Sequence, residues 1–137
     1  MAKPLSILLV EDDFFEILRF NNTVSVLNIN CHIKEAYNGA EALKILESSN
    51  ELPHLILLDI NMPVLNGKEL LKILKSNILY KNIPTVMFTT SQKTNDLKEC
   101  YNLGINGYML KPSNYDEYLS KISSTLNFFS EVEFLNT

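Results

Sequence analysis

Short strand-like runs alternate with stretches of helical periodicity along the whole chain. The strand-like runs cover residues 6–10, 33–37, 55–58, 85–89 and 107–110. Apolar residues recur every three or four positions between and after these runs, which predicts helices over residues 14–27, 40–49, 68–76, 95–103 and 115–129. Because parallel strands need crossover connections, the pattern predicts an α/β fold, with helices on both faces of a five-stranded parallel sheet.

The most apolar strand, Leu55–Leu58, runs directly into a carboxylate, Asp59. A strand without polar positions is typical of burial on both faces of a parallel sheet. An ionised carboxylate beside such a strand is costly unless it is paired, hydrogen-bonded or bound to a metal ion. Asp59 is therefore predicted to have a cation as its partner.

Three other predicted strands also end in polar residues. These endings are Glu11-Asp12-Asp13, Thr89-Thr90-Ser91 and Lys111-Pro112. The functional crevice of an open α/β sheet lies beyond the carboxyl ends of its strands. We therefore expect acids, a hydroxyl group and a lysine to meet Asp59 at one edge of the sheet.

Most of these residues also have an ordinary structural interpretation. Asp13 precedes a predicted helix and suits an N-cap, with Asp12 as an exposed turn residue. Thr89 is of a type that strands favour, and Thr90 is an alternative hydroxyl one position away. Lys111 by itself would be a solvated lysine. Capping explains neither the second acid nor the carboxylate after the third strand.

Composition narrows the function classes. The chain has 137 residues, 46% of them hydrophobic, and a net charge of -4, which predicts a single globular domain. Without a basic stripe, direct binding of nucleic acid is not expected. The apolar run 6–10 is too short for a signal peptide or a membrane span. Cys31 and Cys100 show no metal-site spacing, so we expect free thiols in a cytoplasmic protein.

Four motifs, in this order, resemble the receiver domains of two-component response regulators. They are Glu11-Asp12-Asp13, Asp59-x-x-Met62-Pro63-x-x-x-Gly67, Thr89, and Tyr108-x-x-Lys111-Pro112. Each motif alone is weak, but together they are very specific and extend over nearly the whole chain. The resemblance implies a flavodoxin-like (βα)5 three-layer sandwich with the strand order 2-1-3-4-5.

The resemblance also implies a phosphoacceptor aspartate, Asp59, with a Mg²⁺ site beside it. Asp13 and Asp59 would be direct ligands, and Asp12 would act through water. The main-chain carbonyl of Asn61 would complete the set of ligands that the protein supplies to the ion. Mg²⁺ suits such a set because it takes one or two carboxylates and keeps several waters.

Two further residues are implied to stabilise the phosphoryl group. Lys111 would place an ammonium group against it, and the hydroxyl of Thr89 would hydrogen-bond one of its oxygens. Movement of Thr89 would leave space for Tyr108 and change the face formed by the fourth helix, fifth strand and fifth helix. Packing at a strand end is the alternative role of Tyr108. The family also has a cis bond before the proline, so the Lys111–Pro112 bond is expected to be cis.

These features predict a response regulator that receives a phosphoryl group from a sensor histidine kinase. Mg²⁺-dependent self-phosphorylation and self-dephosphorylation at Asp59 are the only reactions expected, so no turnover enzyme is predicted. Residues 1–127 would form the receiver domain and residues 128–137 a short aromatic tail, with no separate output domain. Residues 96–108 and the tail resemble the small regulators that partner bacterial phytochromes.

The tail is unusually apolar. Its apolar residues are Phe128, Phe129, Val132, Phe134 and Leu135. Because exposure of so much apolar surface is unfavourable, the tail is expected to fold back or to meet a partner. A homodimer through the fourth and fifth helices and the tail is one hypothesis.

Other functions fit the sequence less well. A phosphorylation-independent interaction domain would be expected to have lost an acid or the lysine, and none is lost. A hydrolase of the haloacid-dehalogenase type would need a second acid where Asn61 stands. A flavodoxin-like electron carrier would need a phosphate-binding loop where three acids stand. A relay role, in which the phosphoryl group passes on to a histidine phosphotransfer protein, stays open.

Overall fold

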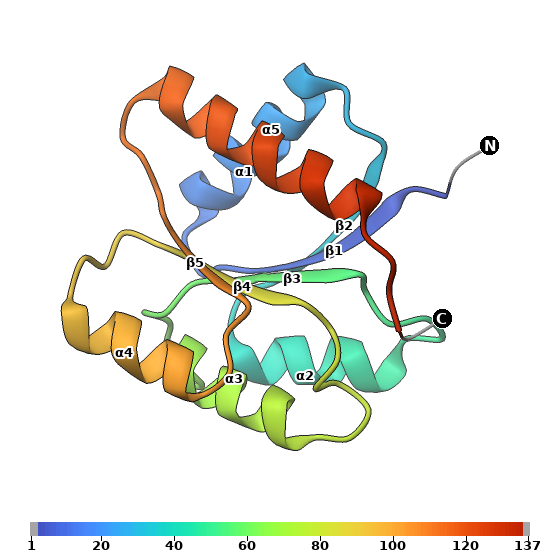
Figure 1. Ribbon diagram of the computed structural model, residues 1–137, viewed down its shortest axis with the longest axis vertical. Helices are drawn as coiled ribbons and strands as arrows, with labels where there is room; N and C mark the ends of the chain where they lie inside the picture. The colour runs from blue at the N-terminus through green and yellow to red at the C-terminus, as the bar shows by residue number, and fades with distance from the viewer. Residues whose placement is uncertain (1–2, 136–137) are drawn as a thin grey trace.

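The computed structural model describes residues 3–135 as a parallel sheet between two layers of helices (Figure 1). The strands are β1 (Leu5–Val10), β2 (Cys31–Ala36), β3 (Leu55–Leu58), β4 (Thr85–Thr89) and β5 (Gly107–Leu110). The helices are α1 (Phe14–Leu27), α2 (Gly39–Ser48), α3 (Gly67–Ser76), α4 (Thr94–Asn102) and α5 (Tyr115–Glu131). The strand order is β2-β1-β3-β4-β5, which confirms the flavodoxin-like prediction.

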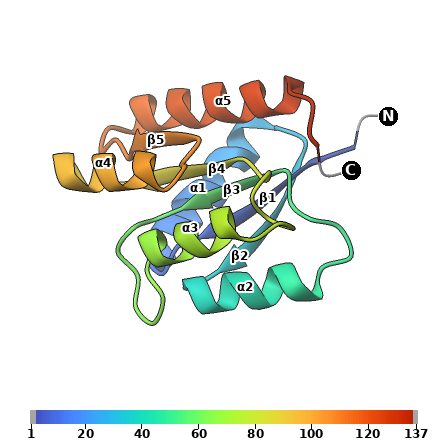
Figure 2. The ribbon, with the colours of Figure 1, turned by 60° about the horizontal axis from the view of Figure 1, so that its bottom comes forward.

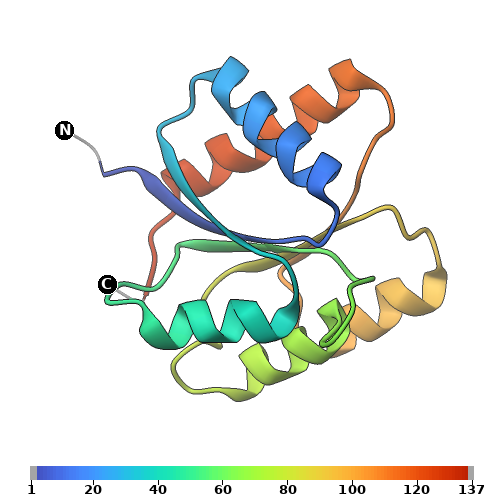
Figure 3. The same cartoon turned by 180° about the vertical axis from the view of Figure 1, so that it is seen from behind.

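The two faces of the sheet are covered by different helices. Helices α1 and α5 lie side by side on one face, and α2, α3 and α4 cover the other (Figures 2 and 3). Successive residues of β3 pack into opposite cores. Ile56 and Leu58 belong to the core under α2, α3 and α4, whereas Leu55 and Leu57 belong to the core under α1 and α5. This double burial explains why β3 has no polar residue.

Main-chain hydrogen bonds extend the sheet one residue beyond three of its strands. The N–H of Glu11 bonds to β2 at 2.9 Å, that of Asp59 to β1 at 3.1 Å, and that of Lys111 to β4 at 2.8 Å. Each of these residues is the first after its strand. Three charged side chains are thus anchored on rigid backbone at the carboxyl edge of the sheet.

Two element boundaries differ from the predicted ones by two residues, and the other differences are of one residue. β2 begins earlier, at Cys31, because it pairs with β1 from Leu5 onward as an edge strand with little apolar signal. α5 continues to Glu131, so the first part of the predicted tail is helical. Neither α5 nor any other helix within residues 3–135 is long and apolar enough to cross a membrane.

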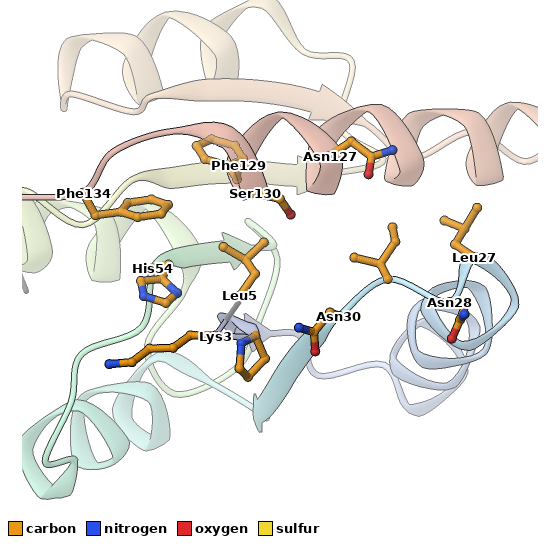
Figure 4. A pocket seen from close by; sticks show the side chains of 12 residues that line it. Lys3, Leu5, Leu27, Asn28, Asn30, His54, Asn127, Phe129, Ser130 and Phe134 are labelled. Atoms are coloured by element: carbon orange, nitrogen blue, oxygen red, sulfur yellow. The ribbon is translucent and has the colours of Figure 1, made fainter. Parts of the chain in front are cut away.

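The segment after α5, as far as Leu135, folds back toward the amino-terminal edge of the sheet. The ring of Phe134 stacks on His54, with 4.8 Å between the ring centres and 24° between their planes. Nδ1 of His54 accepts a hydrogen bond from the N–H of Ser6 at 2.9 Å. His54 and Phe134 line part of a cavity of about 410 Å³ (Figure 4). Phe128 and Leu135 remain exposed.

Candidate functional site

Four side chains meet at the carboxyl edge of the sheet. Glu11 follows β1, Asp59 follows β3, Thr89 is the last residue of β4, and Lys111 follows β5. Glu11 and Thr89 are buried, and Asp59 is half-buried. The structure therefore brings together Asp59, Thr89 and Lys111, which the sequence placed at separate strand ends.

Lys111 and Glu11 form a buried ion pair. Nζ of Lys111 donates a hydrogen bond to Oε1 of Glu11, and only 6% and 4% of the two side chains are exposed. Burial raises the pKa of Glu11 to about 7, although the hydrogen bond and the charge of Lys111 act in the opposite direction. Since an uncompensated buried charge is costly, Glu11 holds the ammonium group at this edge.

Asp59 lies where additional positive charge would be favourable. Burial is the largest influence on its carboxyl group and raises its pKa, and the negative charge of Asp12 adds to this rise. The charge of Lys111, a hydrogen bond from the Thr89 side chain and one from the backbone of Ile60 lower the pKa. A cation beside Asp59 would therefore stabilise its ionised form.

Three carboxylates form a cluster that fits a divalent cation. Glu11, Asp12 and Asp59 offer oxygens that all lie within 4.8 Å of one another. Glu11 is buried, whereas Asp12 is exposed, so the cluster is open to solvent on one side. Hard cations such as Mg²⁺ prefer oxygen ligands and keep part of their water shell, which suits this arrangement.

Asp13 has a different role from the one implied by the resemblance. Its Oδ1 accepts a hydrogen bond from the N–H of Phe15 at 2.9 Å, and it is the N-cap of α1. Among residues 3–135, the acid cluster contains Glu11 in its place. The prediction of Asp13 as a direct metal ligand is therefore wrong, because capping the unpaired N–H groups of α1 engages this side chain.

The loop after β3 returns tightly against Asp59. The N–H of Gly67 donates to the carbonyl of Ile60 at 2.9 Å. A Cβ atom at position 67 would lie 2.1 Å from the carbonyl oxygen of Asp59, so only glycine fits. This close approach explains the fixed spacing between Asp59 and Gly67. Asn61 lies exposed in the same loop, and the use of its main-chain carbonyl as a ligand stays a prediction.

A chain of hydrogen bonds leads from Thr89 to α3 and α4. The N–H of Ser91 donates to Oγ1 of Thr89 at 3.2 Å, and the hydroxyl of Tyr108 donates to the carbonyl of Ser91 at 3.0 Å. Oγ of Ser91 bonds to the carboxylate of Asp96 in α4. Asp96 in turn pairs with Lys68 of α3 at 2.5 Å. Thr89 and Tyr108 thus meet through Ser91.

The Lys111–Pro112 peptide bond is trans, as are the other peptide bonds of the described residues. The expectation of a cis bond is therefore wrong for this structure. For an X-Pro bond, trans is the more stable form by about 0.5–1 kcal/mol. In this arrangement the carbonyl of Pro112 accepts a hydrogen bond from Nη2 of Arg19 at 2.7 Å.

Sequence reasoning missed two residues of the site. Glu11 belongs to the acid run, but the motifs do not identify it as the partner of Lys111. Glu16 is in the first turn of α1, and its Oε1 lies 3.9 Å from Nζ of Lys111. A usable signal was the position of Glu16 in the sequence, because the first turn of a helix that follows a strand lies near that strand's carboxyl end.

The profile of the family described as the response regulator receiver domain matches residues 7–123. The chain belongs to the response regulator receiver family. This receiver is 31% identical over 133 residues to response regulator Rcp1 of Synechocystis sp. (strain ATCC 27184 / PCC 6803 / Kazusa), a match that covers 93% of this chain and 90% of Rcp1.

Solved structures agree with this assignment. The phosphorylated cyanobacterial phytochrome response regulator RcpA has a TM-score of 0.89 at 28% identity, and the match covers 99% of this chain and 100% of RcpA. The Mn²⁺-bound form of Rcp1 has a TM-score of 0.86 at 29% identity, with 98% and 100% covered. This receiver is therefore a phosphoacceptor of two-component signalling, and a sensor histidine kinase is its partner.

Proposed function

We propose that Asp59 accepts the phosphoryl group and that the aspartyl phosphate changes the surface of the domain. An oxygen of Asp59 forms the bond to phosphorus while the bond from phosphorus to the histidine nitrogen of the kinase breaks, and that nitrogen keeps the electron pair. One observation carries the proposal. The half-buried carboxylate of Asp59 lies within the acid cluster and is also influenced by the Lys111 charge and the Thr89 side chain.

Lys111 and Thr89 are proposed to act on the phosphoryl oxygens. Both lie on ordered backbone, since the N–H of Lys111 donates to the carbonyl of Thr89 at 2.8 Å. An ammonium group and a hydroxyl group fixed in this way can stabilise negative charge as it develops, at little reorganisation cost. Neither residue would need to form a covalent bond.

Mg²⁺ is the cation that we propose for the acid cluster. Glu11, Asp12 and Asp59 would hold it, with the main-chain carbonyl of Asn61 as a further oxygen ligand. When bound, it would offset the repulsion between a carboxylate nucleophile and an anionic phosphoryl donor. The existence of a Mn²⁺-bound form of Rcp1 supports a divalent ion as the ligand of this receiver.

The apolar start of α1 is the surface that we propose for the kinase. Phe14, Phe15 and Leu18 have 66%, 77% and 44% of their surface exposed. Phe14 follows the acid run directly, so this patch adjoins the site. Because exposed apolar patches often mark protein interaction sites, Phe15→Ser should slow transfer from the kinase and leave the reaction with a small phosphoryl donor unchanged.

The output surface is proposed to be the face of α4, β5 and α5. The Ser91 contacts with Thr89 and Tyr108 support this proposal, because they connect the edge of the sheet to β5 and α4. If the Thr89 hydroxyl group moves toward the phosphoryl group, these contacts change, and the equilibrium between conformations of the loop before α4 shifts.

The setting is proposed from the similarity to RcpA, a cyanobacterial phytochrome response regulator. A phytochrome-like kinase would be the donor in the cytoplasm, and a histidine phosphotransfer protein would be a second partner if the protein relays its phosphoryl group. Transfer to Asp59 and hydrolysis of the product are the only reactions proposed for the chain. Residues 1–127 would form the receiver domain in which these reactions occur, with residues 128–137 as an appended tail.

We further propose a homodimer through α4, α5 and the tail. Phe128 is 62% exposed on α5, and Leu135 in the tail is 80% exposed. Burial of both on a second copy would be favourable, and two-fold dimers are the commonest oligomers. Sedimentation with Mg²⁺ and beryllofluoride should show a dimer that Phe128→Ser weakens. A wild-type protein that stays monomeric would overturn this proposal.

Intact mass after incubation with acetyl phosphate tests the main proposal. The wild type should gain one phosphoryl group in the presence of Mg²⁺, and Asp59→Asn should gain none. Folding of both proteins is checked by circular dichroism. If the folded wild type forms no adduct under any condition, or if Asp59→Asn forms the same adduct, Asp59 is not the acceptor.

A further inference from the structure

Glu11 belongs to two groups of charges at once. Its carboxylate accepts the hydrogen bond of Lys111, and it is also one of the three carboxylates whose oxygens lie within 4.8 Å of one another. Both oxygens of Glu11 already accept hydrogen bonds, Oε1 from Lys111 and Oε2 from the N–H of Asp13 at 3.1 Å, so a divalent cation that binds Glu11 competes with these donors. Once Glu11 is shared with a cation, Lys111 needs a second acceptor to stay in its buried position.

Glu16 offers this second acceptor. Its Oε1 lies 3.9 Å from Nζ of Lys111, beyond hydrogen-bond length but within ion-pair range. The same oxygen is buried and has no hydrogen-bond donor among residues 3–135. Buried polar atoms usually have a partner, because the lost hydration must be replaced. The oxygen is therefore placed to receive a donor in another state of the site.

We propose that Glu16 is a positioning residue that keeps Lys111 at the phosphoryl group when Glu11 is engaged with the cation. This inference rests on the proposed function. An ammonium group has three donors, so Lys111 can donate to a phosphoryl oxygen on Asp59 and to Glu16 at the same time. The present separation of 3.9 Å needs to shorten by only about 1 Å to become a charge-assisted hydrogen bond.

The neighbouring residues leave Glu16 available for this role. Arg19 is engaged elsewhere, since its guanidinium group lies 3.7 Å from the centre of the Tyr118 ring and also bonds to the backbone after Lys111. The hydroxyl of Tyr118 is buried and likewise has no hydrogen-bond partner among the described residues. Burial raises its pKa, Arg19 opposes this, and the charges of Glu16 and Glu11 add to the rise.

The test is Glu16→Gln, which keeps the shape of the side chain and removes its charge. The rate constant of phosphorylation at saturating acetyl phosphate and Mg²⁺ should fall by about tenfold, the effect of losing one charge-assisted hydrogen bond. Mg²⁺ affinity, followed by amide chemical shifts of the acid cluster, should also fall, because Lys111 then lacks its second acceptor when the cation engages Glu11. Glu47→Gln, at an exposed position of α2, is the matched control and should react like the wild type.

A second readout follows Lys111 directly. With Mg²⁺ and beryllofluoride as the phosphoryl mimic, the ammonium protons of Lys111 should be protected from exchange with water in the wild type. In Glu16→Gln the ¹⁵N signal of this ammonium group should shift or broaden. A normal rate in Glu16→Gln, or a lower rate with an unchanged Lys111 signal, would overturn this role. If the variant does not fold, the wild-type complex with Mg²⁺ and beryllofluoride provides the test. Nuclear Overhauser contacts between Lys111 and Glu16 are expected in it, and their absence would overturn this role. A folded wild type that forms no adduct would instead overturn the proposed function, and this role with it.

Discussion

The hydroxyl group of Tyr108 donates a hydrogen bond to the main-chain carbonyl of Ser91 at 3.0 Å. Tyr108 lies in β5 and Ser91 in the loop after β4, so this bond joins two segments of the carboxyl edge. The N–H of Ser91 also donates to Oγ1 of Thr89 at 3.2 Å. Ser91 therefore connects the hydroxyl proposed to hold the phosphoryl group with the aromatic residue of the proposed switch.

Tyr108→Phe should loosen this loop without preventing phosphorylation. The change removes one hydrogen bond, which typically contributes about 1 kcal/mol, and keeps the ring packed. Amide hydrogen exchange over residues 90–93 should become faster, while the acetyl phosphate adduct still forms. Tyr101→Phe, at an exposed position of α4, is the control. Unchanged exchange in Tyr108→Phe would show that the loop is held by other contacts.

Lys68→Met should release α4 from α3. Lys68 pairs with Asp96 at 2.5 Å and with Glu99 at 2.7 Å, whereas only Cys100 of α4 is buried. The melting temperature should fall by a few degrees, and added salt should reduce the difference from the wild type because it screens exposed charges. Lys72→Met, at an exposed position of α3, is the control.

The same ion pair predicts the pH dependence of that difference. Hydrogen bonds from Lys68 and then Ser91 hold the pKa of Asp96 below its ordinary value of 3.8. A group whose folded pKa is lowered contributes stability above its unfolded pKa and loses it as the pH falls through the folded value. Urea unfolding should therefore show a constant difference between wild type and Lys68→Met near neutral pH, and a decreasing one below the ordinary pKa of Asp96.

Gly67→Ala should destabilise the protein and slow the reaction of Asp59. The new Cβ would lie 2.1 Å from the carbonyl oxygen of Asp59, and backbone cannot move aside as a flexible side chain can. We expect a loss of about 3 kcal/mol in urea unfolding, as for severe overpacking. Gly107→Ala is the matched control, because its Cβ would meet Val86 at an ordinary 3.6 Å. Equal stability of the two variants would contradict this account of the loop.

The hydrophobic pattern was sufficient to predict the sheet and the edge at which Asp59, Thr89 and Lys111 meet. Strand ends are well defined where an apolar run meets a charged residue, and parallel topology then brings such ends together. Edge strand β2 was placed less accurately, since its side chains are alternately half-buried and exposed and leave little apolar signal.

The sequence pattern could not predict which of the three acids after β1 face the site. The acids lie between a strand and a helix, where neither the strand period nor the helix period applies; they are Glu11, Asp12 and Asp13. The structure shows that Asp13 caps α1, because its side chain accepts the hydrogen bond of the N–H of Phe15. Contacts between distant elements, such as Lys111 with Glu16, depend on how helices pack on the sheet and were missed for that reason.

Mg²⁺ affinity should rise with pH until it levels off above neutrality. Burial raises the pKa of Glu11 to about 7, from an ordinary value of 4.5. A cation binds the ionised carboxylate, so below pH 7 its binding must release a proton, which weakens the apparent affinity. Without a cation, the folded state keeps this proton between pH 4.5 and 7 while the unfolded chain has lost it, so the contribution of Glu11 to stability decreases as the pH rises.

Thermal unfolding and Mg²⁺ titration from about pH 5 to about pH 8 measure both effects. The stabilisation by Mg²⁺ should be larger at the upper end of this range, because more Glu11 is ionised before the cation binds. Glu11→Gln removes the titrating group and should flatten the dependence of Mg²⁺ affinity on pH. If the wild type already shows a flat dependence, the ion pair with Lys111 outweighs burial and Glu11 is ionised throughout.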